Sequence, residues 1–382
     1  ENPYLLSGEA CGVEFSVTDG IAMGMGLAAD SDQRLQAAVT FELSHNENNG
    51  HVFLPRNKLI SATTQLLDSG AELVEQALDS LIERGAVVQE QVANVEACYL
   101  RRLWEAECSA CIRLAGLLAA DTDRSAQAGR AVDELEAQQG ITYAPLQRQA
   151  VELAARTGVL VLTGGPGTGK TTTVRGIVAL FRRMGLEIVL AAPTGRAAKR
   201  MSELTGMEAQ TVHRMLGMSW NDVTHQVTFQ KTEKEPLEAD AVIVDEMSMV
   251  DLALFSALLR ALRPGTRLVL VGDADQLPSV GAGNVFSDLI RSGRVFLREV
   301  FRQAEQSAII RNAHAVNLGQ PPQLANNQGD FFFLCRRDGE RTLSTVVELC
   351  KTRLPDHMGI PADQIQVLTP TRKGPSGTEN LN

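Results

Sequence analysis

The amino-acid sequence predicts an α/β fold built on a parallel sheet. Four near-continuous apolar runs are separated by helical stretches, and the first run leads into a glycine-rich loop that opens a helix. Strands of a parallel sheet are covered on both faces, so they read as unbroken apolar runs. The alternation of strand and helix then indicates the α/β class. The predicted strands lie at residues 158–163, 186–192, 241–245 and 267–271.

The chain of 382 residues is too long for one ordinary domain. A polar stretch at residues 127–140 predicts a boundary there. We therefore expect a helical N-terminal region over 1–140, the parallel-sheet domain over 141–304, and the beginning of a second α/β domain over 305–382. Apolar runs at 331–334 and 365–370 predict the opening strands of that second domain. Because the sequence starts with Glu1, we also expect it to begin inside a longer protein.

The N-terminal region combines a short turn-and-helix unit at 12–26 with a second pattern from residue 50 onward. That second pattern is a strand, two amphipathic helices and a β-hairpin, which is typical of a winged-helix unit. Such a unit either binds duplex DNA or packs against a partner, and its low basic content favours packing. The elements are expected at residues 51–54, 56–67, 71–84, 85–88 and 96–100.

The net charge of −10 argues against a protein that coats nucleic-acid phosphates over its whole surface. It leaves open a local groove that grips one strand. Cys108 and Cys111 form the one close cysteine pair, and with no histidine nearby we favour two small helix residues over a zinc or redox site. No apolar run is long enough to span a bilayer, so no membrane partner is expected.

The glycine-rich loop is the strongest motif, because residues 164–171 match the pattern G-x-x-x-x-G-K-[ST] at every position. Backbone N–H groups of such a loop surround phosphates, Lys170 reaches the β- and γ-phosphates, and the Thr171 hydroxyl is a ligand of Mg²⁺. The motif predicts a site for ATP and Mg²⁺. Its nucleotide-binding residues are expected to be Gly165, Pro166, Gly167, Thr168, Gly169, Lys170, Thr171 and Thr172.

Two further motifs follow predicted strands. Asp245 and Glu246 end one strand, where Asp245 would hold Mg²⁺ and Glu246 would orient the attacking water. Gln276 follows the next strand, where it would sense the γ-phosphate and couple hydrolysis to movement. Each motif alone is also compatible with a polar turn. Their order after the glycine-rich loop favours the catalytic interpretation.

Other candidate functional residues lie outside these three motifs and are indicated less strongly by the sequence. Gln147 lies before the first strand and is a candidate for binding adenine, with a solvated helix residue as the alternative. Arg302 is a candidate arginine finger that reaches the γ-phosphate, with an ordinary surface arginine as the alternative. A polar insertion at 217–236 reads as a β-hairpin that either splits a duplex or is a plain surface excursion.

A strand end at residue 192 is followed by residues suited to binding DNA phosphates through backbone groups, a hydroxyl and a guanidinium. A helix cap is the alternative, and we favour DNA. Thr211 and His213 would continue that path, although a lone histidine is more often packed or on the surface. The candidate DNA-binding residues are Pro193, Thr194, Gly195, Arg196, Thr211 and His213.

With these motifs in place, the sequence resembles the RecD family of superfamily 1 bacterial helicases over nearly its whole length. The resemblance is carried by residues 164–171, 192–198, 211–214, 245–251 and 272–278, with 300–303 and 369–370 in support. The N-terminal segments 2–4, 19–22 and 50–51 are similar to the stand-alone branch of the family, which works without RecB and RecC.

The resemblance implies two RecA-like motor domains with ATP between them and a hairpin pin at 217–236. It implies 5′-to-3′ movement on single-stranded DNA and unwinding of forked or 5′-tailed duplexes in repair or recombination. It further implies a monomer in the bacterial cytoplasm, associated with the nucleoid, with single-strand-binding protein as a candidate partner. The family's later motifs are not found, and its helix-hairpin-helix repeats are expected upstream of Glu1.

Two rival functions remain open at this point. A P-loop kinase or GTPase shares the fold, but a GTPase needs an Asn-Lys-x-Asp segment to read its base, and the sequence has none. A P-loop ATPase that binds DNA without unwinding it, as a scaffold or regulatory module, is the second rival. Lys170, Asp245 and Glu246 are all present, which favours a working motor.

Overall fold

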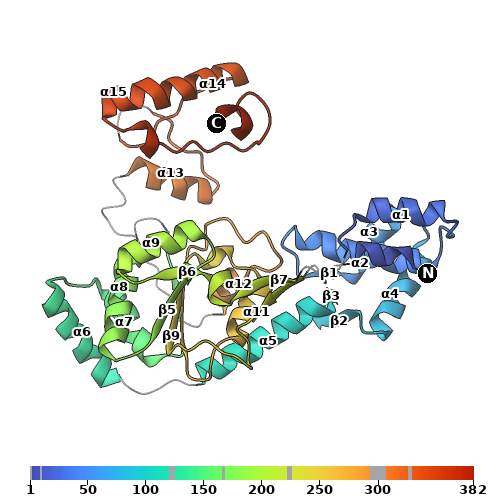
Figure 1. Ribbon diagram of the computed structural model, residues 1–382, viewed down its shortest axis with the longest axis horizontal. Helices are drawn as coiled ribbons and strands as arrows, with labels where there is room; N and C mark the ends of the chain where they lie inside the picture. Colours follow the sequence, from blue (N-terminus) through green and yellow to red (C-terminus); the bar gives the residue numbers. More distant parts are fainter. Residues whose placement is uncertain are drawn as a thin grey trace. The chain divides into compact units, whose positions relative to one another are not determined.

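The computed structural model describes residues 2–8, 11–119, 125–165, 168–221, 226–292, 307–325 and 329–382. The chain divides into two compact units, residues 1–304 and 305–382. The first unit contains a helical N-terminal region and a five-stranded parallel sheet (Figure 1). None of the described helices is long and apolar enough to cross a membrane.

The N-terminal region begins with helical elements and continues with a small antiparallel sheet. Strand β1 pairs with β3, and β3 pairs with β2, in the order β1-β3-β2. Helices α3 and α4 stand between β1 and β2 in sequence, so the predicted winged-helix pattern is confirmed. The elements are η1 Pro3–Ser7, α1 Phe15–Gly24, α2 Asp32–Glu47, β1 Phe53–Pro55, α3 Arg56–Leu67, α4 Ala71–Glu83, β2 Val87–Val92 and β3 Val95–Leu100.

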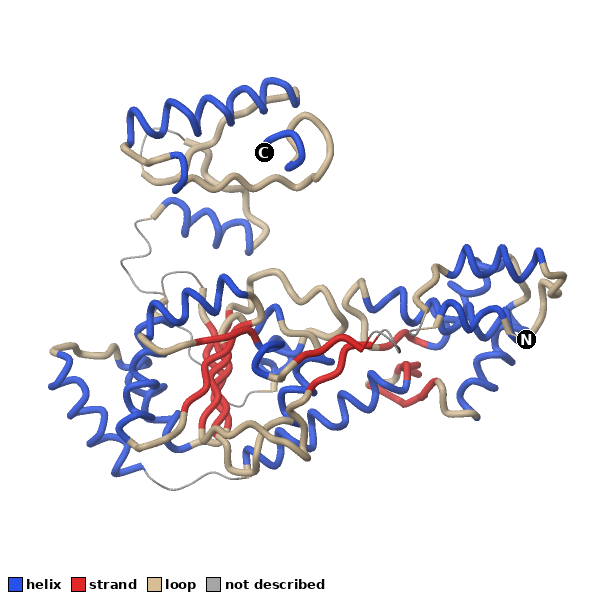
Figure 2. The backbone as a smooth tube through the Cα atoms, viewed as in Figure 1, coloured by secondary structure: helices blue, strands red, loops and turns tan. Residues whose placement is uncertain are grey.

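The parallel sheet has the strand order β4-β10-β9-β5-β6, and its strands run side by side in Figure 2. All four predicted strands are present, because continuous apolar segments are buried on both faces of the sheet. The short strand β6 is additional, and its sequence Ala-Gln-Thr carries no apolar signal. The strands are β4 Val159–Thr163, β5 Ile188–Ala192, β6 Ala209–Thr211, β9 Ala241–Val244 and β10 Arg267–Gly272.

Helices cover both faces of this sheet and bury two separate apolar layers. One layer joins α5 and α11 to the sheet, and the other joins α6, α7 and α8 to it. Val132 and Leu135 of α6 lie within the second layer, so the polar stretch at 127–140 is part of the sheet domain's packing. The helices are α5 Arg101–Leu118, α6 Ser125–Gln139, α7 Pro145–Arg156, α8 Lys170–Arg183, α9 Gly195–Thr205, α10 Val212–Met215, η2 Met247–Met249, α11 Leu252–Arg260 and α12 Val285–Arg291.

The predicted hairpin is present as β7 Met218–Asn221 and β8 Gln226–Phe229, which pair antiparallel and extend away from the sheet in Figure 2. Gly217, with φ of 65°, precedes it and marks its base. Trp220 is 55% exposed and lies opposite Val227. The hairpin therefore presents apolar side chains to solvent.

The second unit contains helices joined by extended loops, and no strand is found among its described residues. The predicted strands at 331–334 and 365–370 are therefore wrong. A strand requires a hydrogen-bonded neighbour, and apolar content alone does not supply one. Phe332 is 57% exposed and Leu368 is 85% exposed. The elements are α13 Ala308–Asn317, α14 Gly339–Glu348, η4 Leu349–Arg353, α15 Leu354–Met358, η5 Ala362–Gln364 and α16 Thr378–Leu381.

Candidate nucleotide site

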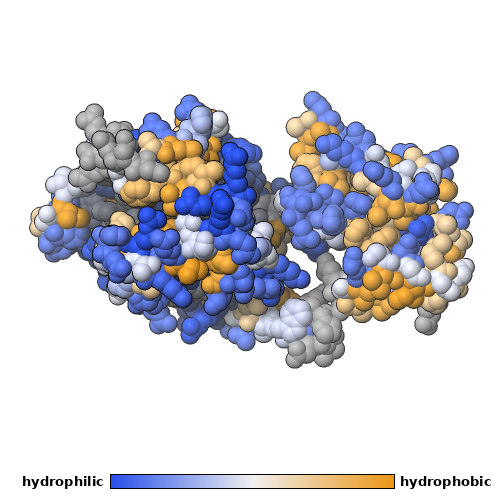
Figure 3. Space-filling model, turned by 90° about the horizontal axis from the view of Figure 1, so that it is seen from above, coloured by the Kyte–Doolittle hydropathy of each residue, from blue (hydrophilic) through white to orange (hydrophobic). Residues whose placement is uncertain are grey.

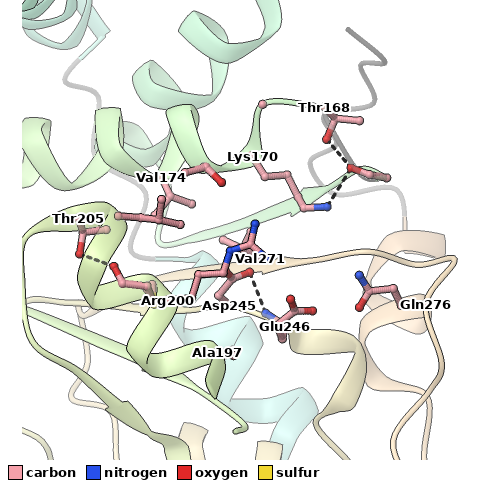
Figure 4. A pocket seen from close by; sticks show the side chains of 15 residues that line it. Thr168, Lys170, Val174, Ala197, Arg200, Thr205, Asp245, Glu246, Val271 and Gln276 are labelled. Carbon is pink, nitrogen blue, oxygen red and sulfur yellow. Dashed lines mark hydrogen bonds between the residues drawn. The ribbon is translucent and has the colours of Figure 1, made fainter. Parts of the chain in front are cut away.

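A cavity of about 450 Å³ lies at the carboxyl ends of the parallel strands. This edge of a parallel sheet is where ligands bind in α/β folds. The loop after β4, the loop after β9 and the loop after β10 all contribute to the cavity, and α9 closes its remaining side (Figure 4). Its lining is Gly165, Thr168, Gly169, Lys170, Thr171, Val174, Ala197, Arg200, Met201, Leu204, Thr205, Asp245, Glu246, Val271 and Gln276.

The glycine-rich loop passes from β4 into α8. Gly169 adopts φ of 79° at the N-cap of α8, a left-handed conformation that suits glycine. At Gly164 a Cβ atom would lie 2.6 Å from the Thr168 hydroxyl, so the loop is too tight for a side chain there. The Thr168 hydroxyl donates to the Gly165 carbonyl at 2.9 Å. Pro166 and Gly167 lie outside the described residues.

Lys170 and Thr171 open helix α8 and face the cavity. The Lys170 ammonium donates to the carbonyl oxygens of Gly164 and Gly165, the latter at 3.2 Å. This position holds a cation beside a helix N-terminus, which itself favours anions. Thr172 is exposed and does not line the cavity. The loop thus brings together a cation, a hydroxyl and a helix dipole.

Asp245 and Glu246 face the same cavity from the end of β9. The backbone N–H of Asp245 donates to the carbonyl oxygen of Ala191 on β5 at 2.9 Å. The backbone N–H of Glu246 donates to the Asp245 carboxylate at 2.8 Å. Glu246 has φ of 55°, a left-handed conformation that is strained for a residue with a side chain. With this backbone conformation, the side chains of both successive acids line the cavity.

Burial raises the pKa of both carboxyl groups, and for Glu246 the neighbouring charge of Asp245 raises it further. Lys170 and Arg200 oppose this effect by favouring the charged forms. A partly buried acid of this kind is suited to accept a proton or to orient water.

Gln276 lies in the loop after β10 and is exposed at the mouth of the cavity (Figure 4). Buried Asp273 shapes this loop by accepting from the Asp275 N–H at 3.1 Å. Farther along, the Gly283 N–H donates to the Gly50 carbonyl at 3.1 Å. The loop that carries Gln276 is therefore tied to the N-terminal region.

Gln147 is buried, so the alternative of a solvated helix residue is wrong. Its side chain accepts from the Ala144 N–H at 3.1 Å and donates to the Gly169 carbonyl at 3.4 Å. It lines a small second pocket with Leu146 and Thr173, next to the glycine-rich loop. Gln147 thus joins the start of α7 to the start of α8, and its contact with adenine stays a prediction.

The oxygen donors of the cavity are of the kind that Mg²⁺ prefers. Thr171 offers a hydroxyl and Asp245 a carboxylate, both on the cavity lining. Among the residues the structure describes, no group of three or more His, Cys, Asp or Glu side chains forms a metal cluster. This sparse donor set fits an ion that takes its other ligands from phosphate and water.

The candidate DNA-binding residues meet at one corner of the sheet. Ala192, at the end of β5, pairs with Thr211 at the end of β6, which brings the two segments together. The Thr194 hydroxyl caps α9 by accepting from the backbone N–H of Ala197 at 3.2 Å. The Thr211 hydroxyl caps α10 by accepting from the backbone N–H of Arg214 at 3.2 Å. The His213 ring lies 6.4 Å from the ring of Phe229 at the hairpin base.

Capping alone explains both threonines, and a DNA role for this corner stays a prediction. Arg302 lies outside the described residues.

Comparisons with known proteins agree with this geometry. A family model described as an AAA domain matches residues 147–282, and a model described as the ATP-dependent RecD2 DNA helicase HHH domain matches residues 1–53. The ATP-dependent RecD2 DNA helicase of Deinococcus radiodurans is 34% identical over 386 residues, covering 98% of this chain and 52% of its own length. Over nearly its whole length the chain is therefore similar to the RecD-like helicases of the RecD2 branch.

More distant relatives include the RecBCD enzyme subunit RecD of Mycolicibacterium smegmatis, 40% identical over 215 residues, or 50% of this chain and 37% of that protein. A crystal structure of Pif1 helicase from Candida albicans is similar over 48% of this chain and 46% of its own, at 24% identity and a TM-score of 0.35. The chain spans about half the length of the RecD2 relative.

The HHH match corrects one prediction. Helix-hairpin-helix sequence was expected upstream of Glu1, but the family model places an HHH domain at residues 1–53 of this chain. The 3-10 helix η1 and the helices α1 and α2 lie in this segment, and Gly12 and Gly26 turn the chain with φ of 63° and 86°. These two glycines flank α1 and are the signal that would have revealed the turns.

Arg200 is the site residue that sequence reasoning missed. It lies on α9 and faces the carboxylates of Asp245 and Glu246 across the cavity (Figure 4). In the sequence it stands beside Lys199 and reads as part of a solvated basic face. Only the fold, which places β5 and its helix next to β9, brings Arg200 to this cavity.

Proposed function

We propose that the protein is an ATP-dependent DNA helicase that moves 5′-to-3′ along single-stranded DNA and unwinds forked or 5′-tailed duplexes. The observation that carries this proposal is the single cavity that collects Lys170, Thr171, Asp245, Glu246 and Gln276. The RecD2 relative, named an ATP-dependent DNA helicase, supports the same activity. The direction and a role in repair or recombination rest on family resemblance.

In this mechanism the glycine-rich loop and the N-terminus of α8 bind the phosphates of ATP, and Lys170 neutralises the β- and γ-phosphates. Thr171 and Asp245 would hold Mg²⁺, which neutralises charge that develops on the transferred phosphoryl group. Glu246 orients the attacking water, and its raised pKa suits it to take up a proton. Gln276, at the mouth, senses the γ-phosphate, and Gln147 contacts adenine.

Movement follows from coupling this chemistry to DNA. Thr194, Arg196 and His213 would contact the strand at the corner of β5 and β6, next to α9. Arg302 would complete the site as an arginine finger.

We place the start of the motor domain at α6, whose buried residues pack with α7 and α8, and its end near residue 304. The protein would act as a monomer in the bacterial cytoplasm, with single-strand-binding protein as a candidate partner.

The hairpin β7–β8 is proposed as the pin that separates the strands. Trp220 and Val227 lie opposite each other and are 55% and 45% exposed, which suits them to stack against a terminal base pair. Trp220→Ala in the full-length protein is expected to slow unwinding while DNA-stimulated ATP hydrolysis is retained. Equal loss of both activities would indicate a structural role instead.

Strand displacement by the full-length protein tests the proposed function. Duplexes with a 5′ tail, a 3′ tail or blunt ends are compared, with Lys170→Ala as the inactive variant and exposed Lys58→Ala as the matched control. We expect unwinding of the 5′-tailed duplex only, its loss in Lys170→Ala and its retention in Lys58→Ala. Hydrolysis without unwinding of any substrate would favour the rival ATPase, and equal use of both tails would refute the direction.

A further inference from the structure

Helix α9 forms one wall of the nucleotide cavity and places a cation in it. Arg200, Met201, Leu204 and Thr205 of this helix line the cavity, whereas the neighbouring Lys199 is exposed and does not. Figure 4 shows Arg200 rising from α9 toward Asp245, with Lys170 beyond that carboxylate. The two cations therefore approach the same carboxylates from different elements.

Arg200 lines the cavity together with Lys170 and the two carboxylates (Figure 4). Both Lys170 and Arg200 lower the pKa of Asp245 and of Glu246, against the effect of burial. Gln147, the candidate adenine contact, lines a different pocket with Leu146 and Thr173.

A nucleoside triphosphate would bring further negative charge to this end of the cavity. Lys170 reaches it from the loop side, at the start of α8. Arginine has a planar fork of donors that binds phosphate oxygens in pairs, and Arg200 is exposed and able to reorient. Because Arg200 lines the cavity of Lys170 and not the pocket of Gln147, it is better placed for the phosphates than for the base.

We propose that Arg200 donates hydrogen bonds to the γ-phosphate of bound ATP from the α9 side of the cavity. This inference deepens the proposed function and rests on it. Arg200 is then a further contact to the group that hydrolysis removes, in addition to those proposed for Lys170 and Gln276. Because Thr194 caps the start of the same helix, α9 joins the nucleotide site to the corner proposed for DNA.

Nucleotide affinity of the full-length protein tests this contact. A non-hydrolysable ATP analogue and ADP are each titrated with Mg²⁺ by calorimetry into wild type, Arg200→Ala, Arg200→Lys and the control Lys199→Ala. We expect Arg200→Ala to bind the triphosphate analogue about 10- to 100-fold more weakly, the scale of a charged hydrogen bond, with ADP affinity unchanged. Arg200→Lys retains part of the lost affinity, and Lys199→Ala binds both nucleotides as wild type does.

Two outcomes overturn the inference. Arg200→Ala binding both nucleotides as wild type does would show that no contact is made. An equal loss for the analogue and ADP, with no recovery in Arg200→Lys, would show that Arg200 acts on the cavity in general and not on the γ-phosphate. Wild type that binds neither nucleotide would instead contradict the proposed function itself.

Discussion

The sheet domain and the second unit differ in how their apolar segments are used. In the sheet domain, β4, β5, β9 and β10 pair with one another and bury nearly all their side chains. In residues 307–382, the apolar segments at 331–334 and 365–370 lie in extended loops, with Leu368 85% exposed. The N-terminal region also keeps apolar surface, visible in orange at the right of Figure 3. Met25 of this region is 63% exposed. Apolar sequence therefore makes a core only where neighbouring strands or helices cover it.

The largest expected change in the free energy of unfolding comes from truncating a buried side chain of the sheet domain, compared with an exposed one of the second unit. Phe255 is 1% exposed in the core between α11 and the sheet. Phe255→Ala should lower the free energy of unfolding by about 3–5 kcal/mol, because it leaves a cavity. Leu368→Ala, at an exposed site, should change it by about 0.5 kcal/mol or less. Urea denaturation of both variants measures the contrast, and equal effects would break it.

Packing density inside the sheet domain provides the second test. A Cβ atom at Gly158 would lie 1.9 Å from the Leu117 carbonyl oxygen, where the end of α5 meets the start of β4. Gly158→Ala should therefore destabilise the domain by about 1–3 kcal/mol through overpacking. Gly116→Ala is the matched control, because a Cβ there meets nothing within 4 Å. Similar melting temperatures for the two variants would contradict the tight contact.

The two carboxylates of the cavity, Asp245 and Glu246, sharpen the comparison, because their burial opposes stability in the sheet domain. Burial and the charge of Asp245 raise the pKa of Glu246 above its unfolded value. The folded state is then favoured at low pH and penalised as the pH rises through the unfolded and folded pKa values. Glu246→Gln removes the penalty, so it should melt at a higher temperature than wild type at pH 8 and at a similar temperature near pH 4.

Thermal melts in EDTA without nucleotide measure this pH dependence. The same substitution should abolish most ATP hydrolysis, which separates the residue's chemical role from its structural cost. A wild type more stable than Glu246→Gln at pH 8 would show that the carboxylate is stabilising.

The smallest expected effect lies in the second unit. The Asp330 carboxylate accepts from the N–H groups of Ala308 and Ile309 and from the Ser307 hydroxyl, at the start of α13. These hydrogen bonds hold the pKa of Asp330 below its usual range. Their contribution is present above the unfolded pKa and lost as the pH falls through the folded pKa.

Asp330→Ala should therefore speed hydrogen exchange of amides in α13 and leave the melting temperature of the sheet domain unchanged. Faster exchange in β4 or β9 as well would show that the effect is not confined to the second unit.

Sequence reasoning located the sheet and the central motifs because each is encoded locally. Apolar runs predicted β4, β5, β9 and β10, and the spacing of residues 164–171 identified the glycine-rich loop. The short strand β6 was missed because its pairing with β5, rather than its composition, makes it a strand. The strands expected at 331–334 and 365–370 are absent for the converse reason, since nothing among the described residues pairs with them.

The residues of the candidate site also divide into those that local sequence predicts and those that only the tertiary structure brings in. Lys170, Thr171, Asp245, Glu246 and Gln276 all line one cavity, as expected of residues at the carboxyl ends of parallel strands. Arg200 is placed there by tertiary structure alone. The burial of Gln147 and its bonds to Ala144 and Gly169 also depend on how α7 meets the loop.

The most direct test of the account is ATP hydrolysis by the full-length protein as single-stranded DNA is added. The account predicts slow turnover without DNA, a saturable increase as the oligonucleotide is titrated, and loss of both rates in Lys170→Ala. Turnover that ignores the oligonucleotide, or that persists in Lys170→Ala, would contradict the claim that this cavity drives movement on DNA.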